Sequence, residues 1–141
     1  MPSGYSASAL VGAYGYNGGV ITPFYQQGRT VYVPLVYGTL AVVVNSTLTG
    51  QYTSSTVPPC AKSMGGYLDI YPNSGNTTAT GFIAYSASYV GAVTVTAHAI
   101  SQSGSHVQFS NFPLNNSTFY YSVTSNNAAT TLSYGMSSYT F

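Results

Sequence analysis

The clearest alternation of apolar and polar side chains lies in residues 92–99. Val93, Val95 and Ala97 fall on one side of an extended strand, and Thr94, Thr96 and His98 fall on the other. Residues 118–124 repeat the pattern, with Phe119, Tyr121 and Val123 on the apolar side. A period of two residues is typical of a strand with one buried face. We therefore predict two strands whose apolar positions point into a core.

Further segments rich in Val, Tyr and Thr, separated by turn residues, predict more strands. These cover residues 20–25, 30–37, 39–46, 67–71, 106–109, 129–134 and 137–141, with breaks at Gly38 and Gly135. The apolar run 40–44 has no alternation, which predicts a central strand through Val42 and Val43 that is buried on both faces. Residues 51–63 predict a loop. Pro23 and Pro34 indicate edges or bends, because proline cannot donate to a ladder.

About eight to ten strands with frequent turns and no convincing helix predict an all-β protein. We expect an antiparallel β-sandwich, a single jelly roll of about eight strands. Residues 19–141 would form this sandwich, and residues 1–18 an extended N-terminal arm. The arm places Tyr5, Tyr14 and Tyr16 among glycines. Exposed aromatic side chains usually have a partner, so we expect the arm to lie on a neighbouring copy.

Charge is nearly absent from the chain. Arg29, Lys62 and Asp69 carry the only fixed side-chain charges, and the net charge is +1. A net charge near zero favours association. Two cations cannot neutralise a nucleic-acid backbone, so we exclude direct nucleic-acid binding. No apolar run reaches the length of a transmembrane segment.

The residues for common catalytic mechanisms are missing. Asp69 is the single carboxylate side chain, whereas glycoside hydrolysis by the usual route needs two. No Gly-x-Ser-x-Gly elbow and no phosphate-binding loop occur. We expect no enzymatic activity and no cofactor. Asp69 is predicted to be structural, paired with Arg29 or Lys62 or bonded to backbone amides.

A metal site is the strongest chemical alternative. A hairpin turn within residues 101–104 would place His98 and His106 opposite each other, and Cys60 could complete a three-ligand site. We favour the simpler interpretation of two unconnected histidines and a packed thiol, with no metal. Cys60 is the single cysteine, so the chain forms no internal disulfide.

Four glycosylation sequons begin at Asn45, Asn76, Asn115 and Asn116. Each falls at a predicted strand end or turn, where an acceptor asparagine can be reached. Tyrosine and asparagine can also line sugar sites. With 15 Tyr in the chain, we interpret them mainly as strand residues that supply apolar area and a hydroxyl.

The run from Phe119 to Tyr134, together with the near absence of charge, resembles exported β-rich proteins of acid- and heat-loving archaea and the coat proteins of their viruses. The resemblance is one of composition and style, and no functional residues carry over. It implies a structural subunit exposed to hot acid.

Within this class, Met1 and the lack of an export signal favour a virion protein. The leading hypothesis is a capsid or coat protein that assembles with many copies of itself, and with other coat proteins. The alternatives are an extracellular filament or surface-layer subunit joined by an arm that adds a strand to its neighbour, and a secreted carbohydrate-binding module.

Overall fold

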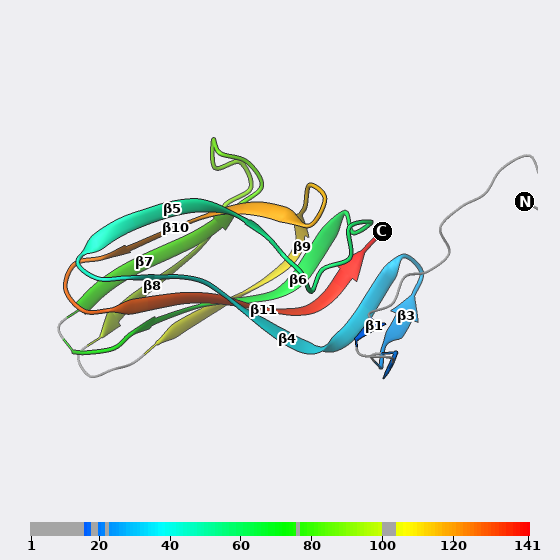
Figure 1. The fold of residues 1–141 in the computed structure, drawn as a ribbon, viewed down its shortest axis with the longest axis horizontal. Coiled ribbons are helices and arrows are strands. Elements are labelled where there is room, and N and C mark those ends of the chain that lie inside the picture. The colour runs from blue at the N-terminus through cyan, green and yellow to red at the C-terminus, as the bar shows by residue number, and fades with distance from the viewer. Residues whose placement is uncertain (1–15, 18–19, 22, 76, 100–103) are drawn as a thin grey trace, which may run out of the picture.

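The computed structural model describes residues 16–17, 20–21, 23–75, 77–99 and 104–141. This part of the chain contains strands and no helix (Figure 1). Nine strands form two antiparallel sheets, as expected for a β-sandwich. The five-stranded sheet has the order β3 (Tyr25–Gln27), β4 (Thr30–Val43), β11 (Thr130–Thr140), β6 (Ser63–Pro72) and β9 (Ser105–Pro113). The four-stranded sheet has the order β5 (Ser46–Thr53), β10 (Thr118–Ser125), β7 (Thr77–Ala84) and β8 (Val93–Ala99).

The eight strands from β4 to β11 pair as a nested hairpin. β4 pairs with β11, β5 with β10, β6 with β9 and β7 with β8, all antiparallel. Successive pairs alternate between the two sheets, and the contacts of β11 with β6 and of β10 with β7 complete each sheet. This is the connectivity of a jelly roll. The predicted fold class is therefore confirmed.

The core lies between the sheets. Val95, Phe119 and Val123 are buried, and Val93 and Tyr121 pack against them from partly buried positions. The inward positions predicted for Val93, Val95, Phe119, Tyr121 and Val123 are thus confirmed, whereas that of Ala97 stays a prediction. The strands β4, β6 and β11 extend past the four-stranded sheet toward β3 (Figure 1).

A loop covers the inner face of this extension. Residues 54–62 connect β5 to β6, and Val57 and Ala61 within them belong to the core cluster. Backbone hydrogen bonds fix the loop at both ends, from Ser54 N to Ser117 O at 2.9 Å and from Lys62 N to Thr140 O at 2.7 Å. A loop was predicted over residues 51–63, but its first residues belong to β5.

Two predicted strand breaks are wrong. β4 continues through Gly38, and β11 continues through Gly135. Neither glycine ends its strand; each leaves space for a tyrosine ring. Gly38 faces the ring of Tyr134, and Gly135 faces the ring of Tyr67. Pro34 lies in a bulge where residues 33–35 of β4 face one residue of β11, as its missing N–H group requires.

The prediction for residues 40–44 is also wrong. Val43 is buried, but Val42 is 56% exposed and Val44 is 60% exposed. β3 pairs only with residues 30–32, so the rest of β4 forms an edge of the sheet among the described residues. Each strand of a two-layer sandwich has one face on the core and one outer face, which explains the alternating burial.

The N-terminal arm lies largely outside the described residues. Tyr16–Asn17 forms β1 and Val20–Ile21 forms β2, which pair as a short antiparallel ladder. The predicted boundary between arm and sandwich falls between these two strands, so the division of the chain stays a prediction. Tyr5 and Tyr14 lie outside the described residues.

Candidate functional site

The outer face of the five-stranded sheet carries a group of polar and aromatic side chains. One row across the sheet contains Tyr37, Gly135, Tyr67 and Gln108, which are register partners on β4, β11, β6 and β9. The next row contains Thr39, Ser133, Asp69 and His106. Their neighbours Leu68 and Ile70 are fully buried on the opposite face, so the alternation of β6 directs Tyr67 and Asp69 outward.

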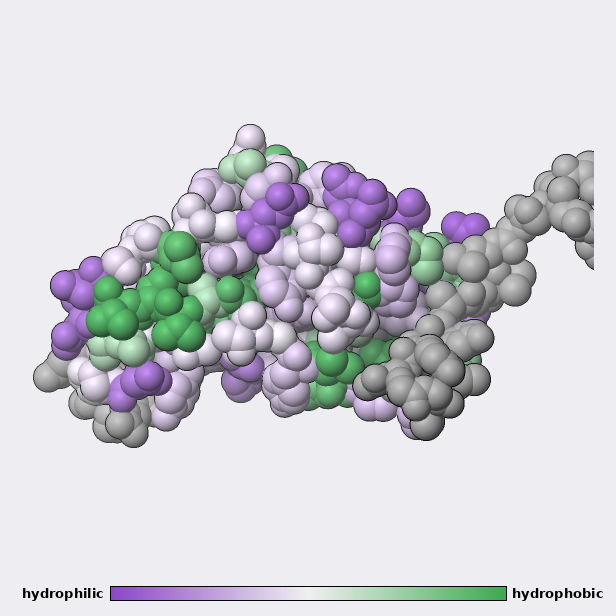
Figure 2. Space-filling model, viewed as in Figure 1, coloured by the Kyte–Doolittle hydropathy of each residue, from purple (hydrophilic) through white to green (hydrophobic). Residues whose placement is uncertain are grey.

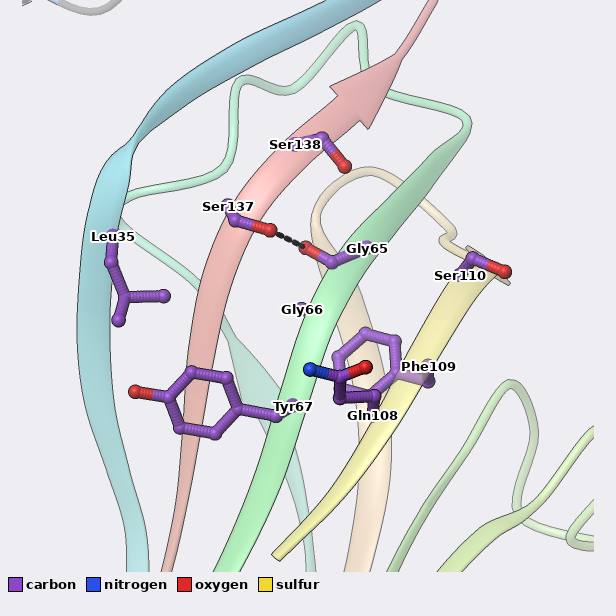
Figure 3. A pocket seen from close by; sticks show the side chains of 9 residues that line it. All are labelled: Leu35, Gly65, Gly66, Tyr67, Gln108, Phe109, Ser110, Ser137 and Ser138. Carbon is purple, nitrogen blue, oxygen red and sulfur yellow. Dashed lines mark hydrogen bonds between the residues drawn. The ribbon is translucent and has the colours of Figure 1, made fainter.

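Two hollows adjoin on this face. The larger has a volume of about 490 Å³ and is lined by Leu35, Gly65, Gly66, Tyr67, Gln108, Phe109, Ser110, Ser137 and Ser138 (Figure 3). The smaller has a volume of about 300 Å³ and is lined by Tyr67, Asp69, His106 and Gln108. Tyr67 and Gln108 line both hollows, so the two adjoin. We call them together the outer-face groove.

Small residues make the groove possible. Because Gly65 and Gly66 of β6 have no side chains, backbone atoms form the floor of the groove there. Ser137 Oγ donates a hydrogen bond to Gly65 O at 3.4 Å (Figure 3). A Cβ at Gly135 would lie 2.7 Å from Tyr67 Cζ and 3.1 Å from Leu35 Cδ1. The Tyr67 ring therefore lies across β11 over a residue without a side chain, an arrangement that shields a strand glycine.

Three rings meet along the groove. The Tyr37 and Tyr67 rings are 5.8 Å apart at an interplanar angle of 72°. The Tyr67 and His106 rings are 6.5 Å apart at 65°. Both are edge-to-face contacts, which aromatic pairs prefer. The contacts hold Tyr67 in place between β4 and β9.

The groove changes the protonation of two of its groups. Burial raises the pKa of Asp69, and the nearby His106 opposes this shift. Burial, a hydrogen bond with Tyr37 and the charges of Tyr37 and Asp69 raise the pKa of Tyr67 to about 12. Both shifts favour the protonated form relative to a fully solvated group, as partial desolvation requires.

The predicted ion pair of Asp69 with Arg29 or Lys62 is wrong. Arg29 O accepts a hydrogen bond from Phe141 N, and Lys62 N donates to Thr140 O, so both cations flank the end of β11. Asp69 is the register partner of Ser133 on β11. Ser133 precedes Thr140 by seven residues, so Asp69 lies roughly 20 Å from the end of β11 where the two cations are. The interacting charge at Asp69 is His106, because the two are register partners on β6 and β9.

The alternative metal site is not assembled. β8 pairs with β7 and β9 with β6, so the predicted hairpin between β8 and β9 is wrong. His98 is the register partner of Thr78 in one sheet, and His106 that of Asp69 in the other. Within the described residues, no three His, Cys, Asp or Glu side chains are grouped to hold a metal ion. Cys60 is half-buried in the loop before β6.

Three of the predicted sequons lie on exposed turns. Asn45 follows β4 with a φ of 43°, and Asn115 and Asn116 precede β10. The hydroxyl of Ser117, which completes the Asn115 sequon, is buried and donates to Val57 O at 2.8 Å. Asn76 lies outside the described residues. Glycosylation at all four positions stays a prediction.

A second surface feature is apolar. Val42 of β4, Val44 just after β4 and Leu48 of β5 are all more than 40% exposed. We call these three residues the β4–β5 patch. Figure 2 shows apolar side chains gathered over this end of the sandwich. β4 and β5 are edge strands of their sheets here, so the patch lies where the sandwich is open.

The loop between β7 and β8 is also apolar at its surface. Tyr85, Tyr89 and Val90 are exposed, and Tyr89 has a φ of 61°, an uncommon conformation for a bulky residue. The Tyr89 ring contacts Phe82 edge to face at 4.8 Å. A backbone bond from Tyr85 N to Val90 O closes the loop at 3.0 Å. These contacts hold the loop in one shape that presents apolar groups to solvent.

Sequence reasoning did not find the outer-face groove. The alternation of residues 67–71 was visible, but Tyr67 and Gln108 are 41 residues apart and meet only through the pairing of β6 with β9. No local motif marks such a site. The available signal was the position of the single carboxylate between two tyrosines on one strand.

Comparisons with known proteins give little further guidance. No protein-family model matches the chain, and no curated protein matches it. A chain in the structure of infectious bursal disease virus, Gx strain, aligns at 10% identity with a TM-score of 0.35. The alignment covers 92% of this chain and 36% of that chain. In the described part of the chain, no helix is long and apolar enough to cross a membrane.

Proposed function

We propose that this protein is a structural subunit that self-assembles into a viral capsid or coat exposed to a hot, acidic environment. The observation that carries this proposal is the exposure of large apolar and aromatic side chains on a surface almost without charge. They are Phe24, Tyr25, Tyr32, Leu35, Tyr37, Val42, Val44, Leu48, Tyr71, Tyr85, Tyr89 and Val90. Exposed apolar side chains that form patches mark interaction sites.

The β4–β5 patch is the contact through which we expect copies to associate. Its three side chains are aliphatic and adjoin the edge of each sheet. Edge strands of soluble proteins are commonly protected by lysine or by inward-pointing charges. β4 and β5 contain no charged residue, and among the described residues the β4 edge is interrupted by the bulge and proline near residue 34. A second copy would cover the patch without having to remove a charge from water.

The jelly-roll connectivity fits a coat subunit. Viral capsid domains use this fold, although lectins and cupins use it too. The fold alone therefore does not decide the function. The near absence of carboxylates supports the acidic setting, because acid unfolds proteins mainly by protonating paired carboxylates. In the proposed role the protein resides in the virion, where it contacts copies of itself and other coat proteins, and it has no enzymatic activity.

Electron microscopy of the purified full-length chain tests the proposal. We expect regular particles from the wild type and none from Val44→Lys, which places a charge in the patch. Thr96→Lys is the matched control, because it adds the same charge at an exposed position of β8. Melting curves of both variants would establish that they fold. Regular particles from Val44→Lys would show that the patch is not the contact.

One observation favours a filament or surface-layer subunit as the second candidate. In the described part of the chain, β4 has no strand partner beyond residues 30–32 on the side of β3. A strand from a neighbouring copy could add to this edge, as in donor-strand exchange. The protein would then be extracellular or at the cell surface. Deleting residues 2–18 should leave a folded domain that no longer assembles, and microscopy of the native source would distinguish a filament from a shell.

A further inference from the structure

We propose that the outer-face groove binds a neutral saccharide, which stacks on the ring of Tyr67 and hydrogen-bonds to Gln108 and Asp69. The inference does not depend on assembly, because the groove and the β4–β5 patch are made of different residues. It assigns a ligand class to a surface whose polar groups have no evident role in stabilising the fold.

The shape of the groove suits an extended ligand. Its larger hollow, about 490 Å³, falls within the range of small-molecule sites. The smaller hollow adjoins it, and together the two follow β6 from Gly65 to Asp69, a length of roughly 13 Å at the rise of a strand. A linear chain of sugar rings could follow this path, with one ring in each hollow.

Tyr67 provides a flat apolar surface. Its ring lies over Gly135 of β11, and Figure 3 shows the ring spread across the outer face of the sheet. The edge-to-face contacts with Tyr37 and His106 hold the ring in this orientation. A fixed ring loses little conformational entropy when a ligand binds. The apolar C–H face of a pyranose is a suitable partner for such a ring.

The polar groups around the ring match sugar hydroxyls. The Gln108 side chain has hydrogen-bond donors and an acceptor, and the Asp69 carboxylate has acceptors only. The hydroxyls of Ser110 and Ser138 can each donate and accept a hydrogen bond. A sugar hydroxyl also donates and accepts, so each of these groups can find a partner. The larger hollow holds no charged side chain.

The distribution of charge selects a neutral ligand. Phosphate, sulfate and uronic acids need an available cation, but neither Arg29 nor Lys62 lines the groove, and His106 already faces Asp69. The Asp69 carboxylate would repel an anion. A cationic ligand would be attracted to Asp69, yet the rings meet edge to face and form no cage around a single point. A hydroxyl-rich neutral ligand uses all of the groups present.

A second copy of the chain is the competing occupant. The exposed aliphatic side chains of the β4–β5 patch provide a more suitable protein contact, since they have no polar groups to satisfy. The outer-face groove is hollowed, and its floor is backbone at Gly65 and Gly66. Covering it with a flat protein surface would leave Gln108 and Asp69 without partners, which is costly.

Titration of the full-length protein with neutral oligosaccharides tests the proposal. The probes are trisaccharides of glucose, mannose, galactose and N-acetylglucosamine, each up to about 10 mM, which detects a Kd near 1 mM. Trigalacturonic acid and choline are the anionic and cationic comparisons. We expect at least one neutral probe to bind, with tyrosine NMR signals shifting, and no binding of the two charged probes.

Variants locate the site. We expect Gln108→Ala to weaken binding at least fivefold and Ser110→Tyr, which fills the rim of the larger hollow, to abolish it. Gln27→Ala is the matched control, because it removes the same exposed side chain from β3. Melting temperatures would confirm that each variant folds.

The proposal is overturned if no neutral probe binds, if a charged probe binds instead, or if binding is unchanged in both groove variants. It is also overturned if these variants abolish self-association and leave saccharide binding intact, because the groove would then be a contact between copies.

Discussion

Gly38 of β4 and Tyr134 of β11 are register partners, and the fully buried ring of Tyr134 occupies the space that a side chain at position 38 would need. The glycine that looks like a strand break in the sequence is thus part of the core. Its absence of a Cβ lets a large ring lie between the sheets, in edge-to-face contact with Phe119 at 5.5 Å.

Gly38→Ala should destabilise the protein. A Cβ would collide with the Tyr134 ring, which cannot move without disturbing Phe119 and Tyr52. Overpacking of this kind costs about 1–3 kcal/mol. Urea denaturation would measure the loss, with Thr39→Ala as a neighbouring exposed control expected within about 0.5 kcal/mol of the wild type. Equal stability of the two variants would mean that the ring has room to shift.

Tyr134→Phe should cost about 1 kcal/mol. The Tyr134 hydroxyl forms hydrogen bonds with Ser54 Oγ at 2.7 Å and with Thr56 Oγ1 at 3.3 Å. Ser54 and Thr56 lie at the start of the loop of residues 54–62. Ser54 Oγ also accepts from the backbone N–H of Val57 at 3.2 Å, so it keeps a partner in the variant. Denaturation of Tyr32→Phe, an exposed tyrosine, provides the control, and a change there as large as at Tyr134 would exclude the hydrogen bond as the cause.

Acid should not destabilise the protein through Asp69. Burial raises the pKa of its carboxyl above the ordinary 3.8, so between that value and the folded pKa the folded state binds more protons than the unfolded state. Stability therefore falls as pH rises through this window and is greatest below it. Melting temperatures from about pH 2 to 6 should be level or higher at the acid end, and Asp69→Asn should remove Asp69's contribution. A melting temperature that falls in acid for the wild type and not for Asp69→Asn would contradict the sign of this shift.

Alkali should destabilise the protein. Burial raises the pKa of Tyr52, Tyr67 and Tyr139 above the ordinary 10.0, reaching about 12 for Tyr67. The unfolded state then loses these protons first, so stability falls as pH rises above 10.0. Melting scans at alkaline pH would show the fall, and absorbance titration would show tyrosines that ionise late. Tyr67→Phe should reduce the fall, and an unchanged fall would assign it to other tyrosines.

The sequence predicts the fold class well and the site poorly. Alternation identifies β8 and β10 because each has one apolar face, but β5 and β7 are rich in Thr and Gly and give no clear pattern. The partners of each strand depend on contacts far apart in sequence. For this reason His98 and His106, which look like hairpin neighbours, belong to different sheets, while His106 lies beside Asp69. The Tyr37–Tyr67 contact over Gly135 requires three strands to align, which no local pattern encodes.

Sedimentation velocity of the full-length protein tests most directly whether copies associate through uncharged contacts. About 1 M salt screens interactions between charges beyond about 3 Å and strengthens none of them. The account predicts large, uniform particles at low and at high salt, at neutral pH and near pH 3, and a monomer for Val44→Lys under all of these conditions. A wild-type protein that stays monomeric at high concentration, or particles that dissociate as salt is added, would contradict it.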